Sequence, residues 1–178
     1  EGYETLTNDK TGLGIILNYS EPSQNLLDHE LKLNSYENAQ AGEPVVGFIG
    51  AGNYASRVLI PAFKEAGAKL HTISTSGGLN SLVHGEKNAF HKASTDTDKL
   101  LQDDQINTVA VVTQHNSHAG FVVKALSEGK NVFVEKPIAI NFEQLEQVKS
   151  AYSAQLEAGK NARVMVGFNR RFSPQVQK

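Results

Sequence analysis

The chain has no cysteine, no long hydrophobic run and no excess of basic residues. The absence of cysteine excludes disulfide bonds and thiolate metal sites. Every apolar run is far shorter than the roughly 18 residues that span a bilayer, and the net charge of −2 gives no sign of a nucleic-acid surface. The first residues are polar and acidic, unlike a signal peptide. We therefore expect a cytoplasmic protein that binds neither membranes nor nucleic acid.

The chain divides into two parts of different character. Residues 1–44 contain one candidate strand, at 13–19, and then a stretch rich in Ser, Asn, Glu, Gln and Pro, which is typical of a linker. We interpret 1–44 as an irregular N-terminal arm, the tail of a preceding domain. The chain begins without Met and ends without a closing element, so we expect it to be a piece of a longer protein.

From residue 45 onward, apolar strand-like runs alternate with segments of helical periodicity. We expect about six strands, at 45–49, 69–75, 91–93, 106–113, 131–135 and 163–167. Helices are expected between them, at 53–66, 79–90, 95–101, 117–128 and 141–159. This alternation predicts an α/β fold of the Rossmann type, which is a doubly wound parallel sheet with helices on both faces. Its ligand should lie outside the carboxyl ends of the strands, beside the first of them.

Several of the expected helices carry end signals. Gly67 and Gly129 stand where a helix stops, as does Gly159. Asn141 with Gln144 forms a predicted capping box, and Thr95 with Asp98 suggests another.

A glycine-rich turn, Gly-x-Gly-x-x-Ala at 50–55, follows the strand expected at 45–49. Gly50 lets the chain turn sharply off the strand, and Gly52, without a Cβ, lets the backbone approach a pyrophosphate. Ala55 lets the next helix pack close to the strand, and the helix start directs its N–H groups at the phosphates. The predicted cofactor contacts of this turn are Gly50, Gly52, Asn53 and Tyr54.

The strand expected at 69–75 ends where an NAD site usually has an acidic residue for the adenosine ribose. Here the chain reads Ser-Thr-Ser-Gly-Gly at 74–78, with no carboxylate and no Arg or Lys. The hydroxyl and N–H groups of Thr75 and Ser76 can serve a ribose or a phosphate, so the cofactor is NAD or NADP. The alternative is that this segment is only a turn and a helix cap.

The segment after the fourth expected strand should pass over the nicotinamide half of the cofactor. Thr113 and His115 are its candidate cofactor contacts, with a surface-loop role as the alternative for His115. Asn116 or Ser117 is suited to cap the next helix, and His118 is expected to pack at the helix start. We expect no metal site, because no carboxylate or cysteine accompanies the two histidines.

Charged residues follow the last two expected strands. Glu135 and Lys136 are predicted cofactor contacts, and the Lys136–Pro137 bond is a candidate for the cis form. Near a nicotinamide, Lys136 can donate a hydrogen bond to a substrate oxygen or move a proton; the alternative is a solvated strand-end charge. Arg170 and Arg171, flanked by aromatic residues, can bind a substrate carboxylate or phosphate, or they belong to a segment that joins two domains.

Taken together, these motifs resemble the glucose–fructose oxidoreductase / inositol dehydrogenase (Gfo/Idh/MocA) family. The resemblance rests on Gly-Phe-Ile-Gly-Ala-Gly at 47–52, Thr113 with Asn116 and His118, Glu-Lys-Pro at 135–137 and Gly-Phe-Asn-Arg-Arg-Phe-Ser-Pro at 167–174. It implies an NAD(P)-dependent oxidoreductase acting on sugar-like or cyclitol substrates, with Lys136 as the catalytic lysine and Arg171 toward a second domain. The chain departs from the family's Thr-Pro-Asn with Thr-Gln-His at 113–115.

The resemblance also implies a substrate domain with an Asp/His pair, which this chain lacks. Residues 45–174 are then a dinucleotide-binding domain without a complete active site, and a homo-oligomer is an option for the parent because family members often pair through the absent domain. Residues 1–17 resemble the end of a zinc-type alcohol dehydrogenase domain, which implies a fusion. The rival interpretation is a non-catalytic dinucleotide-sensing or scaffolding module, favoured by the missing acid at Thr75 and the departure at 113–115.

Overall fold

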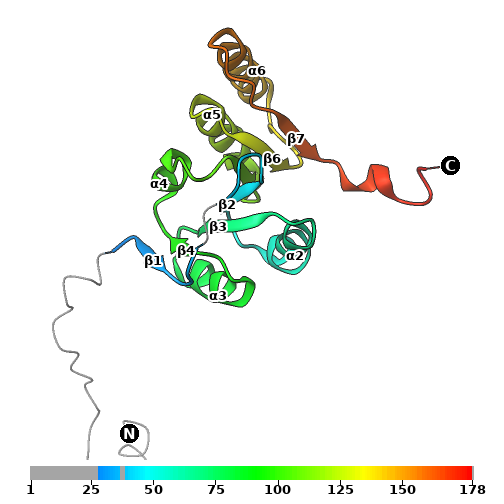
Figure 1. Cartoon of the computed structure of the whole chain (residues 1–178). Helices are drawn as coiled ribbons and strands as arrows, with labels where there is room; N and C mark the ends of the chain where they lie inside the picture. Colours follow the sequence, from blue (N-terminus) through cyan, green and yellow to red (C-terminus); the bar gives the residue numbers. More distant parts are fainter. Residues whose placement is uncertain (1–27, 37–38, 178) are drawn as a thin grey trace, which may run out of the picture.

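The computed structural model describes residues 28–36 and 39–177, and its centre is a seven-stranded sheet (Figure 1). The strand order is β1-β4-β3-β2-β5-β6-β7, and every neighbouring pair is parallel except β1 with β4. The strands are β1 (Glu30–Lys32), β2 (Val45–Ile49), β3 (Lys69–Ser74), β4 (Lys92–Ser94), β5 (Thr108–Val111), β6 (Asn131–Glu135) and β7 (Val164–Gly167). The predicted Rossmann-type fold is confirmed, because the strand order reverses at β2. The strand expected at 13–19 lies outside the described residues.

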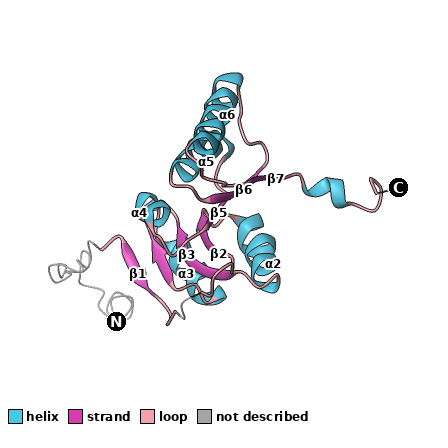
Figure 2. Cartoon of the chain, turned by 45° about the horizontal axis from the view of Figure 1, so that its top comes forward, coloured by secondary structure: helices cyan, strands magenta, loops and turns pink. Residues whose placement is uncertain are grey.

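Helices cover both faces of the sheet, as predicted (Figure 2). The longer helices are α2 (Ile60–Glu65), α3 (Leu79–Asn88), α4 (Thr97–Gln102), α5 (His118–Ser127) and α6 (Phe142–Glu157), and the short turns are η2 (Ala55–Leu59), η3 (His115–Ser117) and η4 (Asn169–Phe172). One apolar core lies beneath α4, α5 and α6, and the other lies beneath η2 and α2. None of the helices in the described part of the chain is long and apolar enough to cross a membrane.

Side chains of the central strand β2 pack in both cores. Val45 and Ile49 pack in the core beneath α4 and α5, whereas Val46 and Phe48 pack in the core beneath α2. All four side chains are at most 2% exposed. Because both faces of the strand are covered, it is a continuous apolar run rather than an alternation of apolar and polar residues.

Local end signals predicted several helix boundaries correctly. The three stop glycines have φ of 73° to 85°, in the left-handed region. Asn141 caps α6, because its side chain accepts a hydrogen bond from the Gln144 N–H at 2.8 Å. The Gln144 side chain in turn accepts from the Ile140 N–H at 3.0 Å, so this helix start is held from both sides.

The capping box predicted at Thr95 and Asp98 is wrong. Asp96 caps α4, because its Oδ1 accepts a hydrogen bond from the Lys99 N–H at 3.0 Å. Thr95 is bound to the arm instead: its N–H donates to the His29 carbonyl at 2.8 Å, and its Oγ1 lies 2.9 Å from His29 Nδ1. Thr95 therefore forms hydrogen bonds with the arm and does not cap α4.

The helix predicted at 53–66 is interrupted by the π-helical turn η2 before it continues as α2. At the junction, the Ile60 N–H donates to the Ala55 carbonyl, which is one residue further back than in an α-helix. Pro61 follows directly, and it has no N–H for the carbonyl four residues earlier, which its ring would also crowd. The wider turn accommodates this proline near the start of the helix.

The arm contributes the strand β1, which sequence analysis did not predict. It pairs with β4 with Leu31 opposite Ala93, so it covers backbone groups at an edge of the sheet. Leu33 then packs against Gly85 of α3, where an added Cβ would lie 2.5 Å from Leu33 Cδ1. Three residues, Glu-Leu-Lys, are too few for a recognisable pattern, and the pairing depends on an edge that is distant in sequence.

His71 of β3 is fully buried among polar partners. Its Nδ1 lies 2.9 Å from Thr72 Oγ1 and its Nε2 lies 3.3 Å from Gln105 Oε1. The ring of Tyr36 packs edge-on against it at 4.7 Å. Burial lowers the pKa of His71 below 6.5, although the carboxylate of Asp103, 3.8 Å away, opposes this shift.

We expect His71 to make the free energy of unfolding depend on pH under mildly acid conditions. Because its folded pKa is lowered, the unfolded chain takes up the proton first as the pH falls. The contribution is fully present above the unfolded pKa of about 6.5 and is lost between there and the folded pKa. Urea unfolding at neutral and mildly acid pH should show a smaller loss for His71→Gln than for the wild type; equal losses would contradict this assignment.

Candidate cofactor site

A cavity of about 710 Å³ lies outside the carboxyl ends of β2, β3 and β5, where the strand order reverses. It is bounded by the glycine turn, by the end of β3 with the start of α3, and by the segment after β5. Its lining includes Gly50, Gly52, Thr75, Ser76, Asn80, Thr113 and Phe121. Doubly wound sheets bind their ligands at this position.

The glycine turn has the geometry predicted for it. Gly50 has a φ of 103°, and an added Cβ would lie 2.7 Å from the Val112 carbonyl oxygen. Its N–H donates to the Ser74 carbonyl at 2.8 Å, which holds the turn against β3. At Gly52 an added Cβ would meet no atom of the described residues within 4 Å. Gly50 therefore makes the turn possible, and Gly52 leaves its backbone open to a ligand.

Thr75 and Ser76 line the end of this cavity beside α3. Thr75 Oγ1 accepts a hydrogen bond from the Ser81 N–H at 3.3 Å, so Thr75 also supports the first turn of α3. Ser74 is buried, with its Oγ 3.2 Å from Thr97 Oγ1. Ser76 is exposed on the rim. The segment is thus a helix start and a cavity wall at the same time.

A second cavity of about 360 Å³ adjoins the first, because both are lined by Gly52, Val112 and Thr113. Its walls come from the helix start after the glycine turn, the segment after β5 and the end of β6. The lining residues are Gly52, Asn53, Tyr54, Ala55, Val112, Thr113, His115, His118, Glu135 and Lys136. The fold therefore gathers at one place the contacts predicted for the nicotinamide half of the cofactor.

Glu135 and Lys136 form the β6 wall of this second cavity, and the Lys136–Pro137 bond is cis. The Oε1 atom of Glu135 is buried and has no hydrogen-bond partner within residues 28–36 and 39–177. A buried acceptor without a donor is costly. This oxygen lies against β7, since a Cβ added at Gly167 would be 2.6 Å from it. The open backbone at Gly52 and the polar groups that line the two adjoining cavities fit an NAD(P) cofactor.

The loop after β5 makes different hydrogen bonds from the helix cap that was predicted there. Ser117 directly precedes α5, as one of the two predicted capping positions, but its hydroxyl makes no capping bond. Its Oγ lies 2.7 Å from Thr113 Oγ1 and donates to the Gln114 carbonyl at 2.8 Å. The hydroxyl of Ser117 thus holds the loop that carries Thr113 toward the cavity.

His118 is fully buried at the floor of the second cavity, in line with its predicted packing at the helix start. Its Nδ1 lies 2.7 Å from the Pro137 carbonyl oxygen and its Nε2 lies 3.0 Å from the Thr113 carbonyl oxygen. Sequence analysis did not predict that this side chain joins two cavity walls, since its only local signal was a place just after a helix cap. The His115 ring lies 5.6 Å away, but the described parts of the chain contain no group of three potential metal ligands.

Arg171 lies outside both cavities of the described structure. It belongs to η4, and its guanidinium lies 4.8 Å from the centre of the Phe172 ring. This segment continues from β7 away from the sheet (Figure 1). The turn η4 contacts the lining of the second cavity through the hydrogen bond from Asn169 Nδ2 to Tyr54 Oη at 3.0 Å. The substrate-side role of Arg171 stays a prediction.

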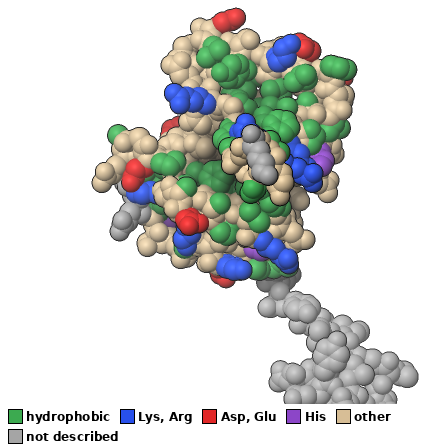
Figure 3. Space-filling view, turned by 90° about the vertical axis from the view of Figure 1, so that its right-hand side faces the viewer, with side chains coloured by type: hydrophobic (Ala, Val, Ile, Leu, Met, Phe, Trp, Pro, Cys, Tyr) green, Lys and Arg blue, Asp and Glu red, His purple; other side chains and the backbone are tan. Residues whose placement is uncertain are grey.

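Apolar side chains are exposed around the C-terminal segment. Figure 3 shows hydrophobic groups on the face from which this segment projects. Phe168 and Phe172 are each 57% exposed, and Met165 of β7 is 48% exposed. Several large exposed apolar groups close together in sequence favour a surface that another domain or chain covers.

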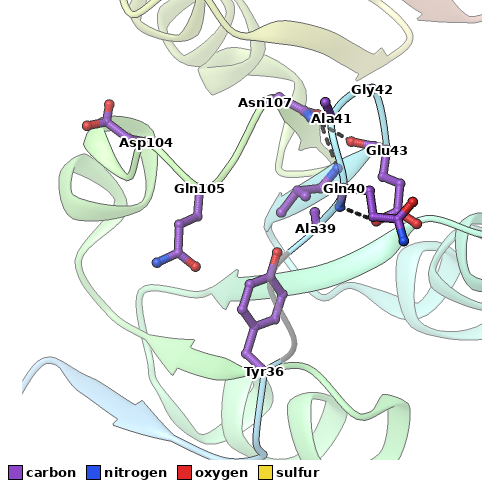
Figure 4. A pocket seen from close by; sticks show the side chains of 10 residues that line it. Tyr36, Ala39, Gln40, Ala41, Gly42, Glu43, Asp104, Gln105 and Asn107 are labelled. Carbon is purple, nitrogen blue, oxygen red and sulfur yellow. Dashed lines mark hydrogen bonds between the residues drawn. The ribbon is translucent and has the colours of Figure 1, made fainter.

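A separate hollow of about 500 Å³ lies at the amino ends of β2 and β5 (Figure 4). The Tyr36 side chain points toward the loop at 39–43, with Gln105 and Asn107 across from it. The buried Tyr36 hydroxyl has no partner among the residues that the structure describes. This hollow is at the end of the sheet opposite the glycine turn, so we assign it no part in the cofactor site.

A family model and several curated proteins match this chain. Residues 45–168 match the Gfo/Idh/MocA model, which describes an oxidoreductase family with an NAD-binding Rossmann fold. The scyllo-inositol 2-dehydrogenase (NAD(+)) of Bacillus subtilis is 38% identical over 85 residues, which are 48% of this chain and 23% of that protein. The myo-inositol 2-dehydrogenase of Thermotoga maritima is 32% identical over 95 residues, 52% of this chain and 26% of that protein.

Solved structures agree on the fold. An oxidoreductase domain protein from Kribbella flavida has a TM-score of 0.66 at 26% identity, over 72% of this chain and 35% of that one. A levoglucosan dehydrogenase in complex with NADH has a TM-score of 0.65 at 24% identity, over 75% of this chain and 37% of that one. A 3-ketoreductase from Actinomadura kijaniata with NADP has a TM-score of 0.68 at 23% identity, over 76% and 40%.

Two facts follow from these matches. The matched part of the chain spans about a quarter of the length of each of the two inositol dehydrogenases. The family model covers most of the chain, from the first residue of β2 to the residue after β7. The chain belongs to the Gfo/Idh/MocA family of NAD-binding oxidoreductases.

Proposed function

We propose that this chain is the cofactor domain of an enzyme that moves hydride between NAD(P) and a carbinol or carbonyl group of a sugar-like or cyclitol substrate. The observation that carries the proposal is the pair of adjoining cavities at the carboxyl ends of the strands, with the open backbone of Gly52 shared by both and Lys136 in the wall of the second. A bound NAD(P) supplies the hydride. The inositol dehydrogenases among the relatives support the substrate class.

The large cavity would hold the adenosine and pyrophosphate part of the cofactor. The backbone at Gly50 and Gly52 and the helix start at Asn53 present N–H groups and a positive dipole end to the phosphates. Thr75 and Ser76 would meet the adenosine ribose. Neither a carboxylate nor a cation stands at 74–78, so both NAD and NADP remain candidates there.

The second cavity would hold the nicotinamide half. Glu135 would accept from a ribose hydroxyl or the carboxamide, while Thr113, His115 and Tyr54 border the same space. Lys136 would donate a hydrogen bond to the reacting oxygen of the substrate and pass a proton to or from it. Positioning by these groups would supply most of the remaining rate enhancement.

Turnover would also need groups beyond this chain. We propose an arm at 1–44, a dinucleotide-binding domain at 45–174 and a substrate domain in a longer parent. The short span of the chain relative to its relatives and the exposed Phe168 and Phe172 support this organisation. Arg171 would then face the substrate domain. We also propose that the parent is cytoplasmic and that its subunits pair through the substrate domain. The proposal includes a fused zinc-type alcohol dehydrogenase domain.

The alternative is a dinucleotide-sensing module without catalysis. It is favoured by the departure from Thr-Pro-Asn at 113–115 and by the absence of an acid at the end of β3. The presence of Lys136 at the second cavity favours the enzyme.

Calorimetric titration of the 178-residue chain with NADH and with NADPH tests the cofactor site. We expect saturable binding of at least one of the two, because the pyrophosphate turn and the nicotinamide wall are both formed in this chain. Absence of binding of both at millimolar concentration would contradict the site. Binding without any NAD(P)-linked turnover of cyclitols or sugars by the parent would favour the sensing module.

A further inference from the structure

His118 connects the two walls of the second cavity without being accessible itself. It is the first residue of α5 and is 0% exposed. One ring nitrogen faces the carbonyl of Thr113, which follows β5, and the other faces the carbonyl of Pro137, which follows Lys136. A ligand in the cavity could contact the neighbouring residues but not this side chain.

Both partners of His118 are carbonyl oxygens, which only accept hydrogen bonds. The distances of 2.7 Å and 3.0 Å are both within hydrogen-bond range. A neutral imidazole carries one ring N–H, whereas an imidazolium carries two. A ring nitrogen of His118 that carries a proton can therefore donate to the carbonyl that it faces.

We propose that His118 is a positioning residue whose ring lies between the Thr113 and Pro137 carbonyls and links them by hydrogen bonding. It thereby sets the spacing between the loop after β5 and the turn that carries Lys136, across the space for the nicotinamide. This inference rests on the proposed function. Residues that bind a ligand need neighbouring residues that hold them in the correct geometry. Here the single side chain of His118 contacts both walls.

The two cavities allow this role to be separated from a general structural one. His118 lines the second cavity and is not part of the lining of the larger one. Loss of its hydrogen bonds should therefore weaken binding of the nicotinamide half while sparing the adenosine and pyrophosphate part.

The experiment measures the dissociation constants of NADH and of ADP-ribose, which lacks the nicotinamide. The proteins compared are the wild type, His118→Gln and His118→Leu. If only NADPH binds, the ligands are NADPH and 2′-phospho-ADP-ribose instead. For His118→Leu, which has no donor, we expect affinity for the reduced cofactor to fall about tenfold or more, with ADP-ribose affinity nearly unchanged. His118→Gln keeps an amide donor and should lose less. The control is His71→Gln, a buried histidine that lines neither cavity, which should change neither affinity.

Equal loss of both ligands in the His118 variants, or loss of neither, would overturn the positioning role while leaving the proposed function intact. If the wild type binds neither ligand, the proposed function itself fails. Nitrogen-15 NMR of the wild-type histidine rings gives a second readout that needs no variant. We expect a ring N–H of His118 that exchanges slowly with solvent, as a buried hydrogen-bonded proton does, and rapid exchange of every His118 ring proton would overturn the proposal even if both variants fail to fold.

Discussion

Replacing Gly50 by alanine is expected to destabilise the fold and remove cofactor binding together. Its φ of 103° is a conformation that L residues rarely adopt, which costs about 1–3 kcal/mol. The added methyl group would also lie 2.7 Å from the Val112 carbonyl oxygen, inside van der Waals contact. Since Gly50 lines the large cavity, relief of this overlap would displace the turn that we propose binds the pyrophosphate.

Gly52→Ala is the matched control, two residues further along the same turn. An added Cβ there meets no described atom within 4 Å, and the backbone is not in the left-handed region. We expect its free energy of unfolding to stay within about 0.5 kcal/mol of the wild type. The methyl group would instead occupy space at the pyrophosphate, so cofactor affinity should fall about tenfold or more, equal to at least ~1.4 kcal/mol of binding energy.

Urea unfolding and calorimetric titration of the two variants check this pair. The expected pattern is loss of stability and binding for Gly50→Ala, and loss of binding alone for Gly52→Ala. Full cofactor affinity in Gly52→Ala would show that the phosphates do not approach this backbone. Wild-type stability of Gly50→Ala would show that the turn relaxes without cost.

Replacing Lys136 by alanine is expected to reduce turnover strongly and cofactor affinity little. In a longer parent with measurable NAD(P)-linked turnover, loss of a positioned proton donor should lower kcat by about 10²–10⁴. In the proposed site the cofactor would keep its contacts with the glycine turn and with Glu135, so its dissociation constant should be nearly unchanged. Steady-state kinetics together with cofactor titration separate the two effects.

Two further variants sharpen this test of Lys136. Lys136→Arg keeps the positive charge but gives up its proton far less readily, so it should also lose most turnover. Lys149→Ala removes an exposed lysine that pairs with Glu146 on α6, outside both cavities, and it should behave as the wild type. Unchanged kcat in Lys136→Ala would end the catalytic assignment and favour the sensing module.

The parts of the fold that depend on local chemistry could be predicted from the sequence. The apolar run of β2 required cover on both faces, and the cap at Asn141 and the stop at Gly129 act over a single turn. The turn at Gly50 follows from one conformational requirement. The candidate cofactor residues were predictable for a related reason, because parallel strands that alternate with helices end at one edge of the sheet.

Other features depend on partners that are distant in sequence. The strand β1 forms because β4 offers a free edge, and its approach binds Thr95 and leaves Asp96 to cap α4. Whether Arg171 reaches a ligand depends on what covers the C-terminal segment. Neither hydrophobic periodicity nor a short sequence motif predicts these contacts.

The sequence by itself determined the class of fold, the position of the cofactor turn and the residues at the strand ends, because each follows from rules that act within a few residues or from the alternation of strand and helix. Only the tertiary structure decided that Glu135 and Lys136 line the same cavity as Gly52 and Thr113, and that His118 joins two of its walls. These arrangements arise where β5, β6 and α5 meet, since hydrogen bonds between segments are selected by packing across the sheet rather than by neighbours along the chain.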